Sequence, residues 1–187
     1  WVNELDDWVA QGGTLEQVRE RAKDRGIAIA NLIGFPEWAV PEEDRRAKGF
    51  EEAARCFEIA MELGCPYVAA PPFGIHDREV ELLPVAERFA ALVDLAAASG
   101  VKPLLEYWGI AQTLGTTGET LLVAAECGRP DVQMLTDVFH MYKGSGHHFG
   151  IEHFGAGRLG LIHVNDYPAT PGRAEVTDAD RVSPGDG

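Results

Sequence analysis

Short apolar segments alternate with longer segments of helical periodicity along the chain, and this alternation limits the possible folds more than any other feature. Each apolar segment has the length and composition of a β-strand. The predicted strands are residues 27–33, 66–70, 102–108, 132–138 and 160–165. The predicted helices before and between them are residues 14–26, 41–64, 83–99, 116–128 and 149–157. A repeat of strand and helix predicts an α/β fold with a parallel sheet.

The spacing of the predicted strands favours a closed barrel. From one strand to the next the chain advances by roughly 30 to 40 residues, which is close to the spacing of a (β/α)8, or TIM, barrel. We therefore expect residues 1–187 to form a single TIM-barrel domain in which about five strands are visible. The pattern alone also allows a doubly wound open sheet, but no GxGxxG motif follows any of the predicted strands.

Three of the predicted strands end in residues that bind metal ions. Glu106, Asp137 and His163 each stand near the C-terminal end of a strand. In a parallel barrel these ends all lie on one face, where active sites form. Carboxylate and imidazole ligands together suit Mn²⁺, Mg²⁺, Co²⁺ or Zn²⁺. The sequence therefore predicts a divalent metal ion bound by these three residues.

Charge and cysteine content exclude several other classes of protein. The chain has 30 acidic and 16 basic residues, a net charge of −14. Such a surface repels phosphate backbones and anionic lipids, so neither nucleic acid nor a membrane is expected as a partner. Cys56, Cys65 and Cys127 are widely spaced and form no CxxC motif, which predicts reduced, buried thiols in a cytoplasmic protein.

The residues around the strand ends form a series with a familiar order and spacing. Glu106, Asp137-Val-Phe-His140, His163-Val-Asn-Asp166 and Asp180-Arg181-Val-Ser-Pro184-Gly-Asp-Gly187 together resemble the sugar phosphate isomerase/epimerase family. The resemblance extends over nearly all of the chain and implies a xylose isomerase-like TIM barrel. It implies that Glu106, Asp137 and His163 are metal ligands. It also implies that His140 and Arg181 are catalytic residues that contact the substrate.

The same resemblance implies that the chain is part of a longer one. Aligned with the family, the five visible strands are the third to the seventh, so the sequence is expected to be truncated at both ends. A fourth metal ligand, a Glu, is then expected beyond Gly187. Ketose 3-epimerases of the family carry a second Glu shortly after the ligand Glu, and this neighbourhood holds Gln112 instead.

The chemistry implied is isomerisation or epimerisation of a small-molecule substrate, a sugar, sugar phosphate or keto-polyol with a hydroxyl beside a carbonyl. The metal ion would polarise the carbonyl while Glu106 removes the α-proton to give an enediolate. His140 and Arg181 would donate hydrogen bonds to the substrate oxygens. Trp38 and Trp108 follow strands, and each is expected either to wall the sugar or to pack at the rim.

Three other functions remain open on the sequence alone. An inosose-type dehydratase would use the same scaffold and metal on a keto-cyclitol. An apurinic endonuclease shares this barrel, but it needs more His ligands, and Val182 stands where one of them is required. A barrel that binds a ligand without catalysis is the third, and a homo-oligomer is compatible with each of them.

Overall fold

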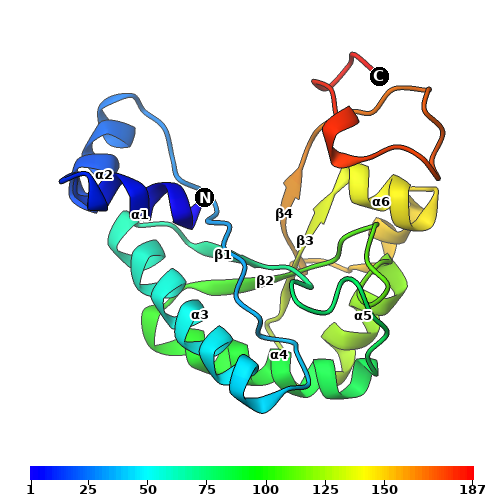
Figure 1. Ribbon diagram of the computed structural model, residues 1–187, viewed down its shortest axis with the longest axis horizontal. Coiled ribbons are helices and arrows are strands. Elements are labelled where there is room, and N and C mark those ends of the chain that lie inside the picture. Colours follow the sequence, from blue (N-terminus) through cyan, green and yellow to red (C-terminus); the bar gives the residue numbers. More distant parts are fainter.

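A computed structural model describes residues 1–187 and shows a parallel sheet with helices packed against it (Figure 1). The strands are β1 (Tyr67–Ala70), β2 (Lys102–Glu106), β3 (Gln133–Asp137) and β4 (Leu159–His163), and they lie side by side in chain order. All three pairings are parallel. Each strand therefore returns to the sheet through a helical crossover, as the predicted strand–helix repeat requires.

Six α-helices surround or follow the strands. They are α1 (Val2–Ala10), α2 (Leu15–Asp24), α3 (Glu43–Leu63), α4 (Leu82–Ala96), α5 (Thr117–Glu126) and α6 (Val138–Ser145). Short 3-10 helices span Ala97–Ser99, Phe149–His153 and Asp178–Asp180. α2 and α5 begin at capping boxes formed by Thr14 with Gln17 and by Thr116 with Glu119. α3 ends at Gly64, whose φ of 69° is the left-handed conformation that glycine adopts most readily.

The main core lies between one face of the sheet and the helices α3, α4 and α5, which lie together along that side (Figure 1). Phe57, Phe89 and Leu105 belong to this core of 30 buried residues. The opposite face carries a smaller cluster that includes Leu104 and Leu135. Because adjacent strand residues point to opposite faces, Leu105 packs in the main core and Leu104 packs in the smaller cluster.

Residues 27–33 do not form the predicted strand. Only Leu32 joins the sheet: its N–H donates to the Tyr67 carbonyl at 3.0 Å, and its own carbonyl accepts from Ala69 N–H at 2.9 Å. Leu32 is buried, whereas Ile27 is 59% exposed. Only the C-terminal end of this segment is buried against the sheet. The prediction of a full strand there is wrong.

The cysteines behave as the sequence predicts. Cys56, Cys65 and Cys127 are buried, and none forms a disulfide. Burial raises the pKa of the Cys56 thiol to about 11, so this side chain packs as a small apolar group. No helix in the structure combines the length and the apolar character that crossing a bilayer requires.

Candidate active site

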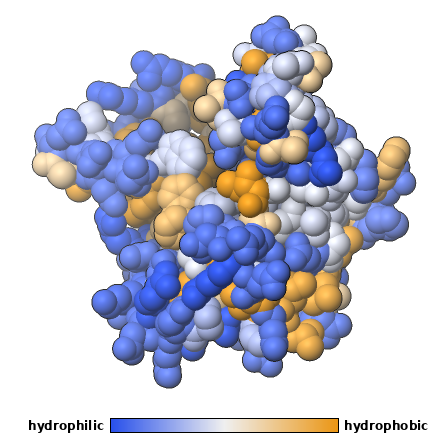
Figure 2. Space-filling view, turned by 45° about the vertical axis from the view of Figure 1, so that its right-hand side comes forward, coloured by the Kyte–Doolittle hydropathy of each residue, from blue (hydrophilic) through white to orange (hydrophobic).

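A cavity of about 490 Å³ opens at the carboxyl ends of the strands. Figure 2 shows the N-terminal and C-terminal parts of the chain standing apart on this face, with apolar atoms in the hollow between them. Eleven residues line the cavity. They include all five residues that the sequence singles out, namely Glu106, Asp137, His140, His163 and Arg181. The structure therefore brings the predicted site residues together.

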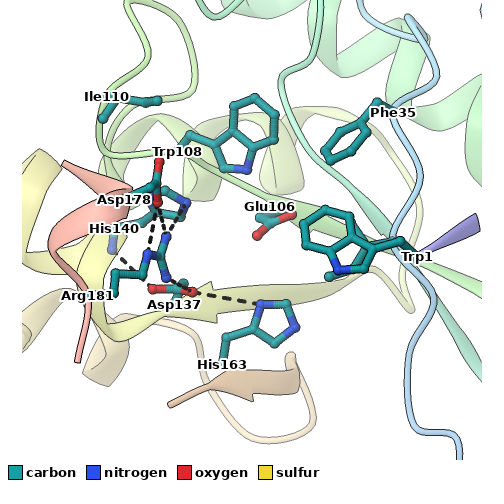
Figure 3. A pocket seen from close by; sticks show the side chains of 11 residues that line it. Trp1, Phe35, Glu106, Trp108, Ile110, Asp137, His140, His163, Asp178 and Arg181 are labelled. Atoms are coloured by element: carbon teal, nitrogen blue, oxygen red, sulfur yellow. Dashed lines mark hydrogen bonds and ion pairs between the residues drawn. The ribbon is translucent and has the colours of Figure 1, made fainter. Parts of the chain in front are cut away.

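The three predicted metal ligands occupy equivalent places on neighbouring strands. Glu106 ends β2, Asp137 ends β3 and His163 ends β4. Asp137 pairs directly with His163, and Glu106 pairs with Leu135, two residues before Asp137. Glu106 and Asp137 are only 5% and 4% exposed. In Figure 3 their side chains and that of His163 point into the same space.

Asp137 holds its place through one of its two carboxylate oxygens. Oδ1 accepts from the backbone N–H groups of Phe139 at 2.8 Å and His140 at 3.3 Å. It also accepts from the side-chain amide of Asn165 at 2.9 Å. Asp137 is thus both the last residue of β3 and the N-cap of α6. Its second oxygen, Oδ2, is left to face the cavity.

Arg181 supplies the partner of that second oxygen. Its Nη1 donates to Asp137 Oδ2 at 2.7 Å, and its Nε and Nη2 donate to Asp178 Oδ1 at 2.8 and 2.5 Å. The guanidinium lies over the ring of Phe139, 4.3 Å from its centroid. Asp137, Asp178 and Phe139 therefore hold the guanidinium on three sides at the edge of the cavity.

His140 contacts the same guanidinium through its imidazole ring. Its Nε2 lies 3.3 Å from Arg181 Nη2, and its Nδ1 is buried without a partner. A guanidinium has donors and no acceptor, so Nε2 accepts this hydrogen bond and the proton of the neutral ring belongs on Nδ1. Burial lowers the pKa of His140 to about 4, which agrees with a neutral imidazole.

The remaining titratable groups are shifted by the same burial. It raises the pKa of Glu106 to about 8, with a further contribution from the nearby charge of Asp137. Burial also lowers the pKa of His163. Asp137 is the exception, because burial, which by itself raises its pKa, is outweighed by the Asn165 hydrogen bond and the charge of Arg181. Asp137 is therefore the ionised carboxylate of the site.

The strand ends carry carboxylate oxygens and an imidazole nitrogen, which are chemically suitable ligands for a divalent cation. Asp137 Oδ2 and His163 Nδ1 are 3.8 Å apart. Two atoms bound tetrahedrally to one Zn²⁺ at about 2.1 Å lie about 3.4 Å apart, so a small movement would let both bind. Glu106 is a buried carboxyl without a cationic partner in contact. As the side chains stand, no three acidic, His or Cys residues are gathered closely enough to hold a metal ion. Their role as ligands stays a prediction.

An aromatic wall faces these polar groups across the cavity. Trp108 follows β2, and its ring lies 6.0 Å from that of Phe35 and 6.4 Å from that of His140. Trp108 and Phe35 both line the cavity (Figure 3). Trp38 does not: its side chain is fully buried, stacks edge-on against Phe89 and donates to the Pro71 carbonyl at 2.8 Å. Of the two predicted tryptophans, only Trp108 borders the cavity.

The segment that carries Arg181 is fixed to α6 and to the end of β4. Tyr167 stacks on Tyr142 of α6 with ring centroids 4.0 Å apart. Lys143 Nζ donates to the carbonyls of Arg173 and Ala174 at 2.9 and 2.8 Å. Backbone hydrogen bonds of 3.0 and 2.9 Å join Asp166 and Val182, the residue after Arg181. These contacts place Arg181 over β3 although 44 residues separate it from Asp137.

Sequence reasoning missed several residues of this site, among them the aromatic Phe35 and the polar residues Asn165 and Asp178. Asn165 binds Asp137, and Asp178 binds Arg181. The capping-box spacing of Thr177 and Asp180 marks the 3-10 helix that presents Asp178, and it is the signal that would have located this residue. His147 and His148 lie in a glycine-rich loop and are exposed, away from the cavity lining.

A parallel sheet with a cavity at the carboxyl ends of its strands is typical of (β/α)8 barrels. Comparison of the sequence with protein families confirms this class. Residues 3–187 match the model of the xylose isomerase-like TIM barrel family, and the chain belongs to that family. The resemblance that the strand-end motifs indicate is thus confirmed.

Individual proteins that resemble this chain have low sequence identity to it. An inosose isomerase of Halalkalibacterium halodurans is 28% identical over 170 residues, which cover 86% of this chain. The match spans only 57% of that protein's length. Among solved structures, the IolI protein with a bound zinc atom has a TM-score of 0.86 at 21% identity, covering all of this chain and 68% of the other. The 3-keto-D-glucoside 4-epimerase from E. coli has a TM-score of 0.70 at 21% identity, covering 81% and 64%.

Proposed function

We propose that this chain contains the active site of a divalent-metal-dependent isomerase or epimerase whose substrate is a sugar or keto-polyol with a hydroxyl beside a carbonyl. The observation that carries the proposal is the shared cavity. Glu106, Asp137 and His163 reach it from three neighbouring strand ends, and His140 and Arg181 border it. The inosose isomerase relative and the structural likeness to a sugar epimerase support the same chemistry.

Asp137, His163 and Glu106 would hold the cation, which when bound supplies Lewis-acid polarisation of a carbonyl. Glu106 takes the proton from the carbon between the hydroxyl and the carbonyl, leaving an enediolate. Its pKa of about 8 would fall with positive charge nearby, and the carboxylate would become available as a base. Returning the proton to the neighbouring carbon, while the hydroxyl proton passes to the former carbonyl oxygen, would complete an isomerisation. Protonation of the opposite face of the same carbon by a second acid would complete an epimerisation.

Arg181 would stabilise the charge that develops on the substrate oxygens, and His140 would position Arg181. The guanidinium presents a planar set of N–H donors, which suits two adjacent oxygens. His140 is neutral, and Arg181 is the donor to its Nε2, so the ring orients the guanidinium. Asp178 and Phe139 also hold the guanidinium at the cavity edge, so little reorganisation is needed at the moment of proton transfer.

The two unlike walls of the cavity fit the shape of a sugar. Trp108, Phe35 and Ile110 offer an apolar surface, and the strand ends offer the polar one. A sugar ring has a C–H face that packs on aromatic rings and hydroxyls that seek polar partners. A substrate seated between the walls would turn its oxygens toward Asp137 and His163.

The test is proton exchange at the reacting carbon. The purified protein is incubated in D₂O with Mn²⁺ or Co²⁺ and a panel of ketoses, hydroxypyruvate and keto-inositols, and NMR follows the α-C–H signals. We expect metal-dependent loss of one α-proton signal together with formation of an isomer, and neither in Glu106→Gln. Loss of water from a keto-inositol would identify a dehydratase instead. No metal-dependent change in any substrate of the panel would contradict the proposal.

A further inference from the structure

The Arg181 guanidinium bridges two carboxylates that differ in their surroundings. Its Nη1 binds Asp137, whose side chain is 5% exposed and belongs to the sheet. Its Nε and Nη2 bind Asp178, whose side chain is 53% exposed and belongs to the 3-10 helix near the C-terminal end of the chain. The two edges of one guanidinium are therefore held by an inner and an outer acid (Figure 3).

The inner contact uses the atom that a metal ion would need. Asp137 Oδ1 already accepts from three N–H groups, which leaves Oδ2 as the oxygen available to a cation. Arg181 Nη1 is 2.7 Å from Oδ2. A divalent cation and a guanidinium edge repel each other at such a distance in a buried site. Cation binding at Oδ2 and the Arg181 contact therefore compete.

The outer contact can persist when the inner one is broken. Asp178 stands three residues before Arg181 and is bound by Nε and Nη2, not by Nη1. The capping box of Thr177 and Asp180 and the backbone pairing of Val182 with Asp166 fix the main chain on both sides of Arg181. Rotation of the side chain about its own bonds would free Nη1 and leave the Asp178 edge in place.

We propose that Arg181 is an exchangeable counter-ion of the cation site and that Asp178 is the positioning residue that retains it at the cavity edge when a cation displaces it from Asp137. The inference rests on the proposed function, since it requires a cation at Asp137. Nη1, once released, faces the cavity as a free donor for a substrate oxygen. Cation binding thereby prepares the substrate site, and the cation binds before the substrate.

The experiment is a double-mutant cycle on cation affinity, measured without substrate. Isothermal titration calorimetry with MnCl₂ is performed on metal-stripped wild-type protein, Arg181→Met, Asp178→Asn and the double variant. Arg181→Met removes the competitor, and we expect it to bind Mn²⁺ at least about fivefold more tightly, the lower end of typical coupling between sites. Asp178→Asn leaves Asp137 as the only acidic partner of Arg181, and we expect binding about two- to fivefold weaker.

The double-mutant cycle distinguishes a positioning role of Asp178 from a purely electrostatic effect of its charge on cation affinity. In the Arg181→Met background there is no guanidinium to retain, so Asp178→Asn should change affinity little. An equal loss in both backgrounds would show that Asp178 acts only through its charge and would overturn its positioning role. Arg173→Met and Asp186→Asn are the controls, because both lie in the same segment, and Arg173 binds backbone carbonyls of α6 instead of Asp137.

The same titrations distinguish failure of the proposed metal site from failure of the Arg181 exchange alone. Wild-type protein that binds no Mn²⁺ would overturn the metal site and the exchange together. Wild-type protein that binds Mn²⁺ with an affinity unchanged or weakened in Arg181→Met would overturn the exchange alone. Circular dichroism verifies the fold of every variant. If Arg181→Met does not fold, Arg181→Gln replaces it with the same expected gain in affinity.

Discussion

Glu106 and Asp137 end neighbouring parallel strands and are almost equally buried, yet the pKa values of their carboxyl groups are shifted in opposite directions. The difference lies in their partners. Asp137 has the Asn165 amide and the Arg181 guanidinium in contact, whereas burial and the charge of Asp137 act together on Glu106. The two strand ends therefore hold one ionised carboxylate, Asp137, and one carboxyl group, Glu106, that keeps its proton near neutral pH.

Glu106 should make the metal-free protein less stable as the pH rises. Its pKa is about 8 in the folded protein against a reference of 4.5, so the folded state binds more protons between these values. Its stabilising contribution is complete below about pH 4.5 and is lost as the pH rises to about 8. We expect the Tm of wild-type protein in a chelator to fall relative to Glu106→Gln by at least about 3 °C over this range. A constant Tm difference between the two proteins would show that Glu106 is ionised throughout.

Asp137→Asn should abolish cation binding while preserving most of the fold. The amide oxygen can still accept from the N–H groups of Phe139 and His140, but the charge facing the cavity is lost. We expect Mn²⁺ affinity to fall by more than about a hundredfold, which exceeds the usual loss for residues that only support a ligand. The matched control is Asp131→Asn, an exposed carboxylate just before β3. Affinity near wild type in Asp137→Asn would remove this residue from the metal site.

His140→Gln should reduce turnover without removing the metal ion. The imidazole accepts from Arg181 and is predicted to act on the substrate side of the cation. We expect kcat to fall about a hundredfold with a smaller change in KM, since the contribution is made in the transition state. Metal content, measured by atomic emission, should equal that of the wild type. His153→Gln, an exposed imidazole in the neighbouring 3-10 helix, is the control. Loss of the metal in His140→Gln would instead make His140 a ligand.

Trp108→Leu should weaken substrate binding more than it slows catalysis. The indole forms much of the apolar wall together with Phe35. Losing an aromatic contact of about 1 kcal/mol corresponds to roughly a fivefold rise in KM. Steady-state kinetics on the substrate found in the exchange assay would measure it, with Trp8→Leu on α1 as the control. An unchanged KM would mean that the sugar does not rest on this wall.

The sequence predicts the sheet side of the site well, because the information there is local. Glu106, Asp137 and His163 each follow an apolar run, and a short apolar run before a polar residue is enough to place a strand end. The barrel family follows from the same motifs. The Arg181 contact with Asp137 is different, since it joins residues 44 positions apart and depends on how the C-terminal segment packs on α6. No local sequence pattern predicts a contact between residues so far apart in the chain.

The errors also have physical causes. Val138 and Phe139 favour strands by propensity, so the sequence extends β3 through Val138, but the Asp137 side chain caps the backbone there and starts α6. Residues 27–33 are apolar enough for a strand, yet only Leu32 pairs with a strand of the sheet. In both places tertiary contacts and capping outweigh the intrinsic preference of the residues.

The cavity takes Asp137 and His163 from strands and Arg181 from an irregular segment that is pinned to α6 by Tyr167 and Lys143. These two sources can change independently over evolution. Under the proposed function, insertions or substitutions between Tyr167 and Arg181 would redirect the guanidinium toward a different substrate while the strand ends keep their geometry. A lineage could in this way acquire new substrates and inherit its proton-transfer chemistry intact. Comparing this segment across relatives with different substrates is therefore the most direct guide to how their specificities diverged.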